Sequence, residues 1–159
     1  MVLQAVTACG VQPVQPVQPK YESYWLYGAV EPKTGEAFYL EMPWLNADAF
    51  SLFLKEMARA YSDGLNILLV DGAGAHRAAN VIVPKNMVLM KLPAYSPEIN
   101  TVERLWLDVK KKIDVFDPNV RASPEALKNH IADILKVYTC EKIQSLTGYD
   151  YILDAVNAQ

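Results

Sequence analysis

The chain has 159 residues, of which 52% are apolar and 21% are charged, and its net charge is −3. This length allows one domain with a sizeable core and excludes two domains of ordinary size. The near-neutral charge excludes a chain that is basic throughout, so any contact with nucleic acid needs a local basic surface.

No apolar run reaches the roughly 18 residues of a membrane span. The opening residues lack a basic leader, so we expect no signal peptide. Cys9 and Cys140 are too few for a disulfide framework or a zinc site, which favours a reducing, cytoplasmic location.

The first 20 residues are expected to form an extended arm. Pro13, Pro16 and Pro19 recur at every third position in "VQPVQPVQP", and this spacing favours a polyproline-like conformation without internal hydrogen bonds. The same spacing also suits a ligand for another domain, but a connector is the preferred interpretation. Residues 21–159 are then the folded domain.

Two strands and a helix are predicted next. Residues 21–30 are rich in aromatic side chains, residues 37–43 also have the pattern of a strand, and the Thr34-Gly35 pair between them predicts an antiparallel hairpin. Residues 46–64 have the pattern of a helix that Asn46 caps and Gly64 ends. Apolar residues recur there at the helical period and predict one buried face.

The second half of the chain continues this alternation. Residues 66–71 and 86–93 are short, mostly apolar runs, as expected for neighbouring strands of a covered sheet, with a short helix between them. Residues 100–113 and 123–138 are predicted to be helices, the latter with Ser123 as its cap. The order indicates the α/β class, a mixed sheet with helices on its faces.

Acidic side chains stand at two places where such a fold collects chemistry. Asp71 closes the strand 66–71, and ligands gather at the carboxyl ends of strands in α/β sheets. Asp71 could equally cap a following helix. His76 lies five residues on and is either a structural group or one that faces the cleft.

Glu103 also has two interpretations. Its spacing from Asn100 is that of a capping box, in which the glutamate accepts a hydrogen bond from the cap residue's backbone N–H. Alternatively, the loop after the second of these strands returns the start of the next helix to the strand ends. Asp71 and Glu103 would then converge there, and two carboxylates suit a hard divalent cation.

The pattern "LLVDGAGAH" followed by "LPAYSPEINTVERLW" resembles the catalytic core of DDE-type transposases, closest to the bacterial insertion-sequence group related to mariner elements, often labelled DDE superfamily endonuclease. The resemblance runs from about Tyr21 to Ile113. It implies an RNase H-like fold and metal-dependent cleavage and transfer of DNA strands. It also implies a two-metal site for Mg²⁺ or Mn²⁺ with Asp71 and Glu103 as catalytic ligands. DNA, as transposon ends, is the implied partner, and the implied DNA-contacting residues are His76, Arg77, Tyr95, Ser96, Asn100, Arg104 and Lys110.

One expected carboxylate has no counterpart. The family's first aspartate lies on the first strand of the sheet, whereas residues 1–21 contain no Asp or Glu and the first acidic residue is Glu22. We therefore expect the first strand to be missing, the site to be incomplete or inactive in the isolated chain, and two copies to be able to pair through an unpaired sheet edge. Four interpretations stay open: an inert remnant, one reading frame of a frameshifted gene, a fragment completed by another chain, and a non-catalytic nucleic-acid-binding or protein-interaction module.

Overall fold

A computed structural model describes residues 24–72, 80–93, 99–114 and 116–157 of the protein, and residues 155–157 by their backbone alone. The extended arm predicted for residues 1–20 lies outside these ranges. So does part of the short helix expected between the second pair of strands: residues 80–86 contain no helix, and residues 73–79 are not described.

The chain begins with the predicted hairpin. Strands β1 (Trp25–Val30) and β2 (Ala37–Met42) pair antiparallel, with Trp25 opposite Met42 and Val30 opposite Ala37. The turn between them needs a glycine, because Gly35 has a φ of 76°. A Cβ there would also clash with the carbonyl oxygen of Cys140, because the turn packs closely against the start of a helix more than one hundred residues further along the chain.

Helix α1 (Ala47–Ala60) follows with the predicted cap. The Asn46 side chain accepts a hydrogen bond of 2.8 Å from the backbone N–H of Ala49, which satisfies one of the unpaired donors at the helix start. Gly64, with a φ of 84°, lies in the turn that leads out of the helix. The Asn46 cap is confirmed, whereas the helix ends at Ala60 with Tyr61 as its C-cap, before it reaches Gly64.

The next two strands are neighbours, as predicted. Strands β3 (Asn66–Val70) and β4 (Met87–Lys91) pair in parallel, and the backbone N–H of Leu92 extends the ladder by donating to the carbonyl of Val70. At the other end of this pair, the Asn86 side-chain amide donates to the Ala58 carbonyl at 3.0 Å, which ties the strand starts to the end of α1.

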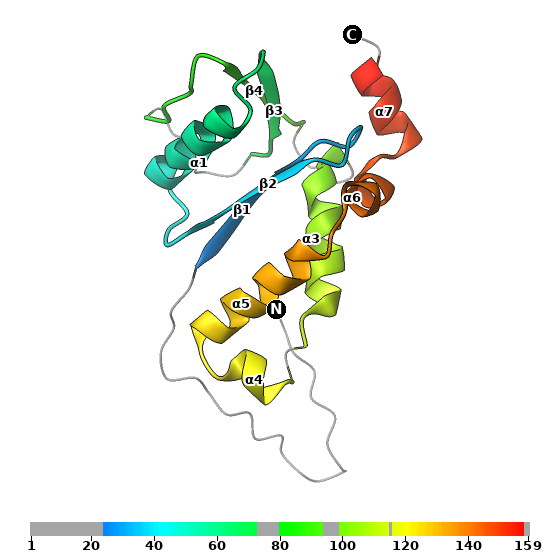
Figure 1. The fold of residues 1–159 in the computed structure, drawn as a ribbon. Coiled ribbons are helices and arrows are strands. Elements are labelled where there is room, and N and C mark those ends of the chain that lie inside the picture. Colours follow the sequence, from blue (N-terminus) through cyan, green and yellow to red (C-terminus); the bar gives the residue numbers. More distant parts are fainter. Residues whose placement is uncertain (1–23, 73–79, 94–98, 115, 158–159) are drawn as a thin grey trace.

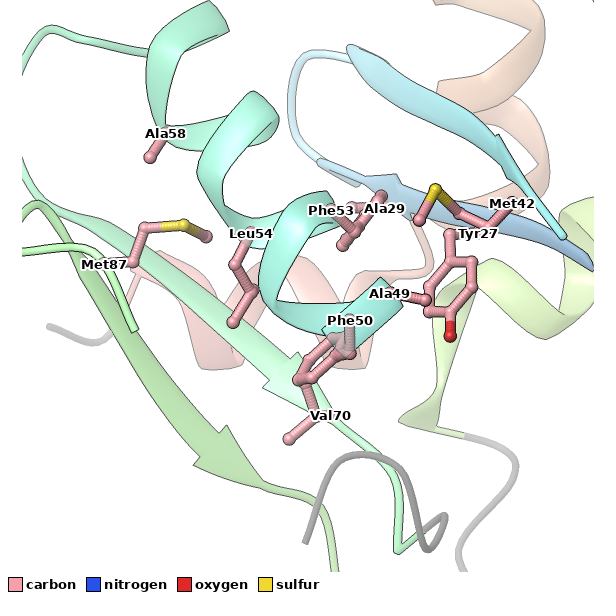
Figure 2. Close-up of a cluster of buried hydrophobic side chains, with 10 residues drawn as sticks. All are labelled: Tyr27, Ala29, Met42, Ala49, Phe50, Phe53, Leu54, Ala58, Val70 and Met87. Carbon is pink, nitrogen blue, oxygen red and sulfur yellow. The ribbon is translucent and has the colours of Figure 1, made fainter. Parts of the chain in front are cut away.

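One helix covers both strand pairs. The apolar side of α1 packs against the hairpin on one side and against β3–β4 on the other, and Figure 2 shows Phe50 between Tyr27 of β1 and Val70 of β3. Phe50 and Leu54 are almost completely buried in this cluster. Both strand pairs therefore share one hydrophobic core with α1.

The strands nevertheless do not join. The mixed sheet expected from the sequence is, within the described residues, two separate two-stranded sheets, β1–β2 and β3–β4. The composition of the fold is α/β, as predicted, and it is compatible with an RNase H-like fold. In the described parts of the chain, no backbone hydrogen bonds join β1 to β3 as they would within one sheet.

A second core lies on the opposite face of the hairpin. It contains α3 (Thr101–Lys112), α5 (Pro124–Lys136) and α6 (Cys140–Thr147), and Figure 1 shows the hairpin between α1 and these helices. Leu105 of α3 is completely buried there. The predicted helices at 100–113 and 123–138 are confirmed, and the Ser123 side chain caps α5 by accepting from the Ala126 N–H at 3.0 Å.

Three helices were not predicted: α4 (Pro118–Arg121), α6 and α7 (Asp150–Asn157). The signals for α6 are present in the sequence, since Thr139 caps it and Gly148 follows its end. A short helix of this kind has few apolar repeats, which makes its period hard to detect. No helix in the described ranges is both long and apolar enough to span a membrane.

Candidate active site

Asp71 lies where the sequence placed it, directly after β3. Val70 is buried, Asp71 is half-buried, and the hydrogen bond from Leu92 to Val70 brings the end of β4 alongside. Asp71 is therefore at the carboxyl edge of a parallel strand pair, where α/β folds present ligands. Gly72 does not have the positive φ or close contact that would require glycine, and among the described residues nothing lies within 4 Å of the Cβ position.

Glu103 lies in the first turn of α3 and is half-buried. The predicted capping box does not form among the described residues: the Asn100 side chain makes no capping hydrogen bond, and its backbone has φ −84° and ψ 88° instead of the extended values seen at Asn46. The Glu103 N–H donates instead to the Asn100 carbonyl at 3.1 Å. Within the described residues no hydrogen bond or ion pair engages the Glu103 carboxylate.

A tryptophan one turn further along fixes the position of α3. Trp106 packs its ring against β1, where a Cβ on Gly28 would lie 2.5 Å from the Cζ2 atom of the ring, and its ring centroid is 5.9 Å from that of Tyr39 on β2. Residues three apart share one side of a helix, so Glu103 and Trp106 are neighbours on α3. The contact between Trp106 and the glycine therefore sets where the Glu103 backbone stands relative to the hairpin.

The far half of α3 is anchored by a separate polar cluster. The Tyr138 hydroxyl donates to the Asp108 carboxylate at 2.6 Å, and Lys112 lies 3.3 Å from the same carboxylate and 4.1 Å from the Tyr138 ring centroid. The hydrogen bond from Tyr138 and the charge of Lys112 lower the pKa of Asp108. This cluster is structural, because it joins α3 to the segment between α5 and α6.

A short segment of the chain leads from the strand end beside Asp71 to the helix that carries Glu103. The segment after β4 starts at Leu92, bonded beside Asp71, and ends at Asn100, where α3 begins. Residues 94–98 of this path are not described. In the parts of the chain that are described, no group of three or more His, Cys, Asp or Glu side chains is arranged to hold a metal ion.

Only some of the predicted DNA-contacting residues lie in the described parts of the chain. His76, Arg77, Tyr95 and Ser96 lie outside the described residues. Asn100 stands at the start of α3, and Lys110 is exposed in its last turn. Arg104 has a partner that the sequence did not suggest: its Nη1 atom donates to the Tyr149 hydroxyl at 2.8 Å. Tyr149 was not singled out from the sequence, and its short "YDY" context is the signal that could have drawn attention to it.

Comparisons with known proteins bear on this arrangement. Residues 4–119 match the family model described as DDE superfamily endonuclease. The uncharacterized protein y4pE/y4sA of Sinorhizobium fredii (strain NBRC 101917 / NGR234) is 39% identical over 83 residues, which are 52% of this chain and 62% of that relative. The match thus covers less than two thirds of the relative's length. No solved structure gives a significant match. Since the family model covers well over half of the chain and includes both Asp71 and Glu103, this chain belongs to the DDE superfamily endonucleases.

Proposed function

We propose that this chain is part of a transposase that cleaves DNA strands and joins them to new sites, and that Asp71 and Glu103 are two of its metal-ligating carboxylates. One observation carries the proposal. Asp71 ends a strand whose parallel neighbour leads, through the segment bonded beside it, into the helix whose first turn holds Glu103. The family match supports the nuclease chemistry. The match does not favour the alternative of a non-catalytic binding module.

The chemistry of these residues suits a divalent cation. Two carboxylates supply hard oxygen donors, which Mg²⁺ and Mn²⁺ prefer. Glu103 stands at a helix start without a described capping partner, so ligating a cation would break no described interaction of its carboxylate. When bound, such ions neutralise charge on the phosphate and activate the attacking oxygen. The chain's own contribution is to hold two carboxylates at fixed positions, one on a strand end and one on a helix that Trp106 anchors.

We further propose that the site becomes complete only when another polypeptide segment adds a strand between β1 and β3. Three observations support this. Neither strand pairs with the other among the described residues, both lie under the same helix α1, and residues 1–21 supply no carboxylate. Adding a strand to exposed edges is a common way for separate chains to combine. That strand would bring the further carboxylate which a two-metal site needs.

Binding of Mn²⁺ tests the proposed ligands directly. We expect calorimetry to detect weak Mn²⁺ binding by the unaltered chain, and Asp71→Asn and Glu103→Gln each to reduce the affinity at least about tenfold, since each removes a charged ligand. The matched control is Asp63→Asn, which removes one charge from an exposed turn before β3, at the opposite end of that strand. Circular dichroism spectra should be alike for all four proteins.

Two outcomes would contradict the assignment. The first is an unaltered chain that binds no Mn²⁺ at all. The second is an equal loss of affinity in Asp63→Asn, which would show that the ion responds to overall charge instead of to a site.

A further inference from the structure

Two tyrosines flank the start of α7 and stack on one another. The ring centroids of Tyr149 and Tyr151 are 5.9 Å apart and their planes differ by 20°. Both side chains are substantially exposed, at 37% and 47%. The stacked pair therefore presents aromatic surface to solvent.

This pair is not what holds the neighbouring helix in place. Helix α6 has its own anchors: Ile143 and Thr147 are buried, and the Gln144 side-chain amide donates to the carbonyl of Lys33 in the hairpin turn at 2.5 Å. Gly148 packs closely as well, since a Cβ there would lie 2.8 Å from the carbonyl oxygen of Pro32. The two tyrosines lie beyond these contacts, with their rings partly open to solvent.

A cation joins the stack to the candidate active site. The Arg104 guanidinium lies 4.2 Å from the centroid of the Tyr149 ring and donates to the hydroxyl of the same residue. Arg104 directly follows Glu103 in the first turn of α3. The stacked rings are thereby held next to the helix start that carries the candidate ligand, and Figure 1 shows the α6–α7 segment alongside α3.

We propose that Tyr149, Tyr151 and Arg104 form a stacking platform for an unpaired nucleobase of a DNA strand. Aromatic rings stack on any base, and a guanidinium contributes a cation–π contact, so this surface would bind without regard to sequence. Asp150 stands between the two tyrosines at the start of α7, and its negative charge disfavours the phosphate backbone there. The chemistry of the platform therefore selects a base over a phosphate.

The inference rests on the proposed function, because a DNA strand that is cut and transferred has an unpaired end. It adds a binding site that the family match does not include, since Tyr149 and Tyr151 lie beyond residues 4–119. It also gives Arg104 a more specific role than the general DNA contact expected from the sequence: the residue orients a ring instead of reaching for phosphate.

The test measures binding of a fluorescent single-stranded oligonucleotide of about ten nucleotides, by anisotropy, with EDTA present. Stacking contributes about 1–3 kcal/mol per base, so Tyr151→Leu should weaken binding about 5- to 150-fold. Tyr149→Phe keeps the ring and should retain most of the affinity. Phe116→Leu is the matched control, because it removes an aromatic ring that is 62% exposed on another part of the surface.

Substrate variants separate stacking from charge. An oligonucleotide of abasic sugars should bind the unaltered chain about as weakly as the intact one binds Tyr151→Leu, and duplex DNA should show no effect of Tyr151→Leu. Thermal denaturation of Tyr151→Leu should match that of the unaltered chain, because its ring is exposed.

The proposal is overturned if the unaltered chain does not bind the single strand, if Tyr151→Leu binds as well as the unaltered chain, or if Phe116→Leu loses as much. Because EDTA removes divalent ions, this result is independent of the Mn²⁺ experiment. Failure of metal binding with base stacking intact would reject the ligand assignment alone, and the reverse would reject the platform alone.

Discussion

Tyr39 shows how a single buried hydroxyl affects stability. Its side chain packs against Trp106, and within the described residues the hydroxyl is buried without a hydrogen-bond partner. Burial, with smaller contributions from Tyr138 and Tyr61, raises the pKa of Tyr39 to about 12. The folded chain thus strongly prefers the neutral phenol, although it leaves that phenol's polar atom unsatisfied.

We expect Tyr39→Phe to stabilise the protein by about 1 kcal/mol at neutral pH, because it removes a desolvated hydroxyl that lacks a described partner. The variant should also lose less stability in alkali. The unfolded chain releases the Tyr39 proton near the ordinary pKa of 10.0, and the folded chain only near 12. The unaltered chain therefore keeps its full stability below pH 10 with respect to this group, and loses stability as the pH rises from 10 through about 12, because the unfolded chain then releases the Tyr39 proton more readily than the folded chain.

Urea denaturation at neutral pH and at about pH 11 measures both effects. Tyr151→Phe serves as the control, since that ring is exposed. A loss of stability at neutral pH, or an alkaline loss as large as that of the unaltered chain, would contradict this account of Tyr39.

At the scale of elements, the contact between α3 and β1 depends on the absence of a side chain. The Trp106 ring occupies the space that a Cβ on Gly28 would need, with its Cζ2 and Cη2 atoms at 2.5 and 2.8 Å. Neither a strand nor a helix pattern shows this requirement, because the two residues are 78 positions apart in the sequence. A glycine within a strand often marks such a close approach.

We expect Gly28→Ala to destabilise the fold by about 1–3 kcal/mol, the usual cost of overpacking. Urea denaturation measures it, and Gly72→Ala is the control because its Cβ would meet nothing within 4 Å among the described residues. If Gly28→Ala were as stable as the control, the ring would have moved aside freely, and Trp106 would not be what fixes α3.

At the scale of the whole molecule, the second strand pair has a face that no described element covers. Side chains alternate along β3 and β4, so Leu68 and Leu89 pack against the α1 core while the other set faces away from it. That outward set is exposed and apolar: Ile67, Leu69, Val88 and Met90. Together with the edge of β3 that no described strand pairs with, it is the kind of surface through which β-sheet proteins associate.

We therefore expect the isolated chain to self-associate as its concentration rises, and the double variant Ile67→Lys, Leu69→Lys to remain more monomeric. Lysines on an edge strand discourage pairing, and both positions face away from the core. Sedimentation velocity measures the distribution. Leu107→Lys is the control, since Leu107 is 55% exposed on α3. A chain that is monomeric at every concentration would show that this face does not bind a second copy.

The sequence by itself determined most of the elements and the place of the candidate carboxylates along the chain. The strands 25–30, 37–42, 66–70 and 87–91 and the helices that follow them could be predicted because their apolar periods and end signals are local. The same is true of Asp71 at a strand end and Glu103 in a first helical turn. The short α6 and α7 escaped prediction because they contain too few repeats.

Only the tertiary structure decided how these pieces meet. Asn46 and Asn100 both precede predicted helices, yet only Asn46 caps with its side chain, because the cap depends on how the preceding segment enters the helix. The partner of Arg104 is 45 residues away, and the two strand pairs share a helix without joining. Contacts between distant segments depend on the packing of the whole chain, and no local pattern records them.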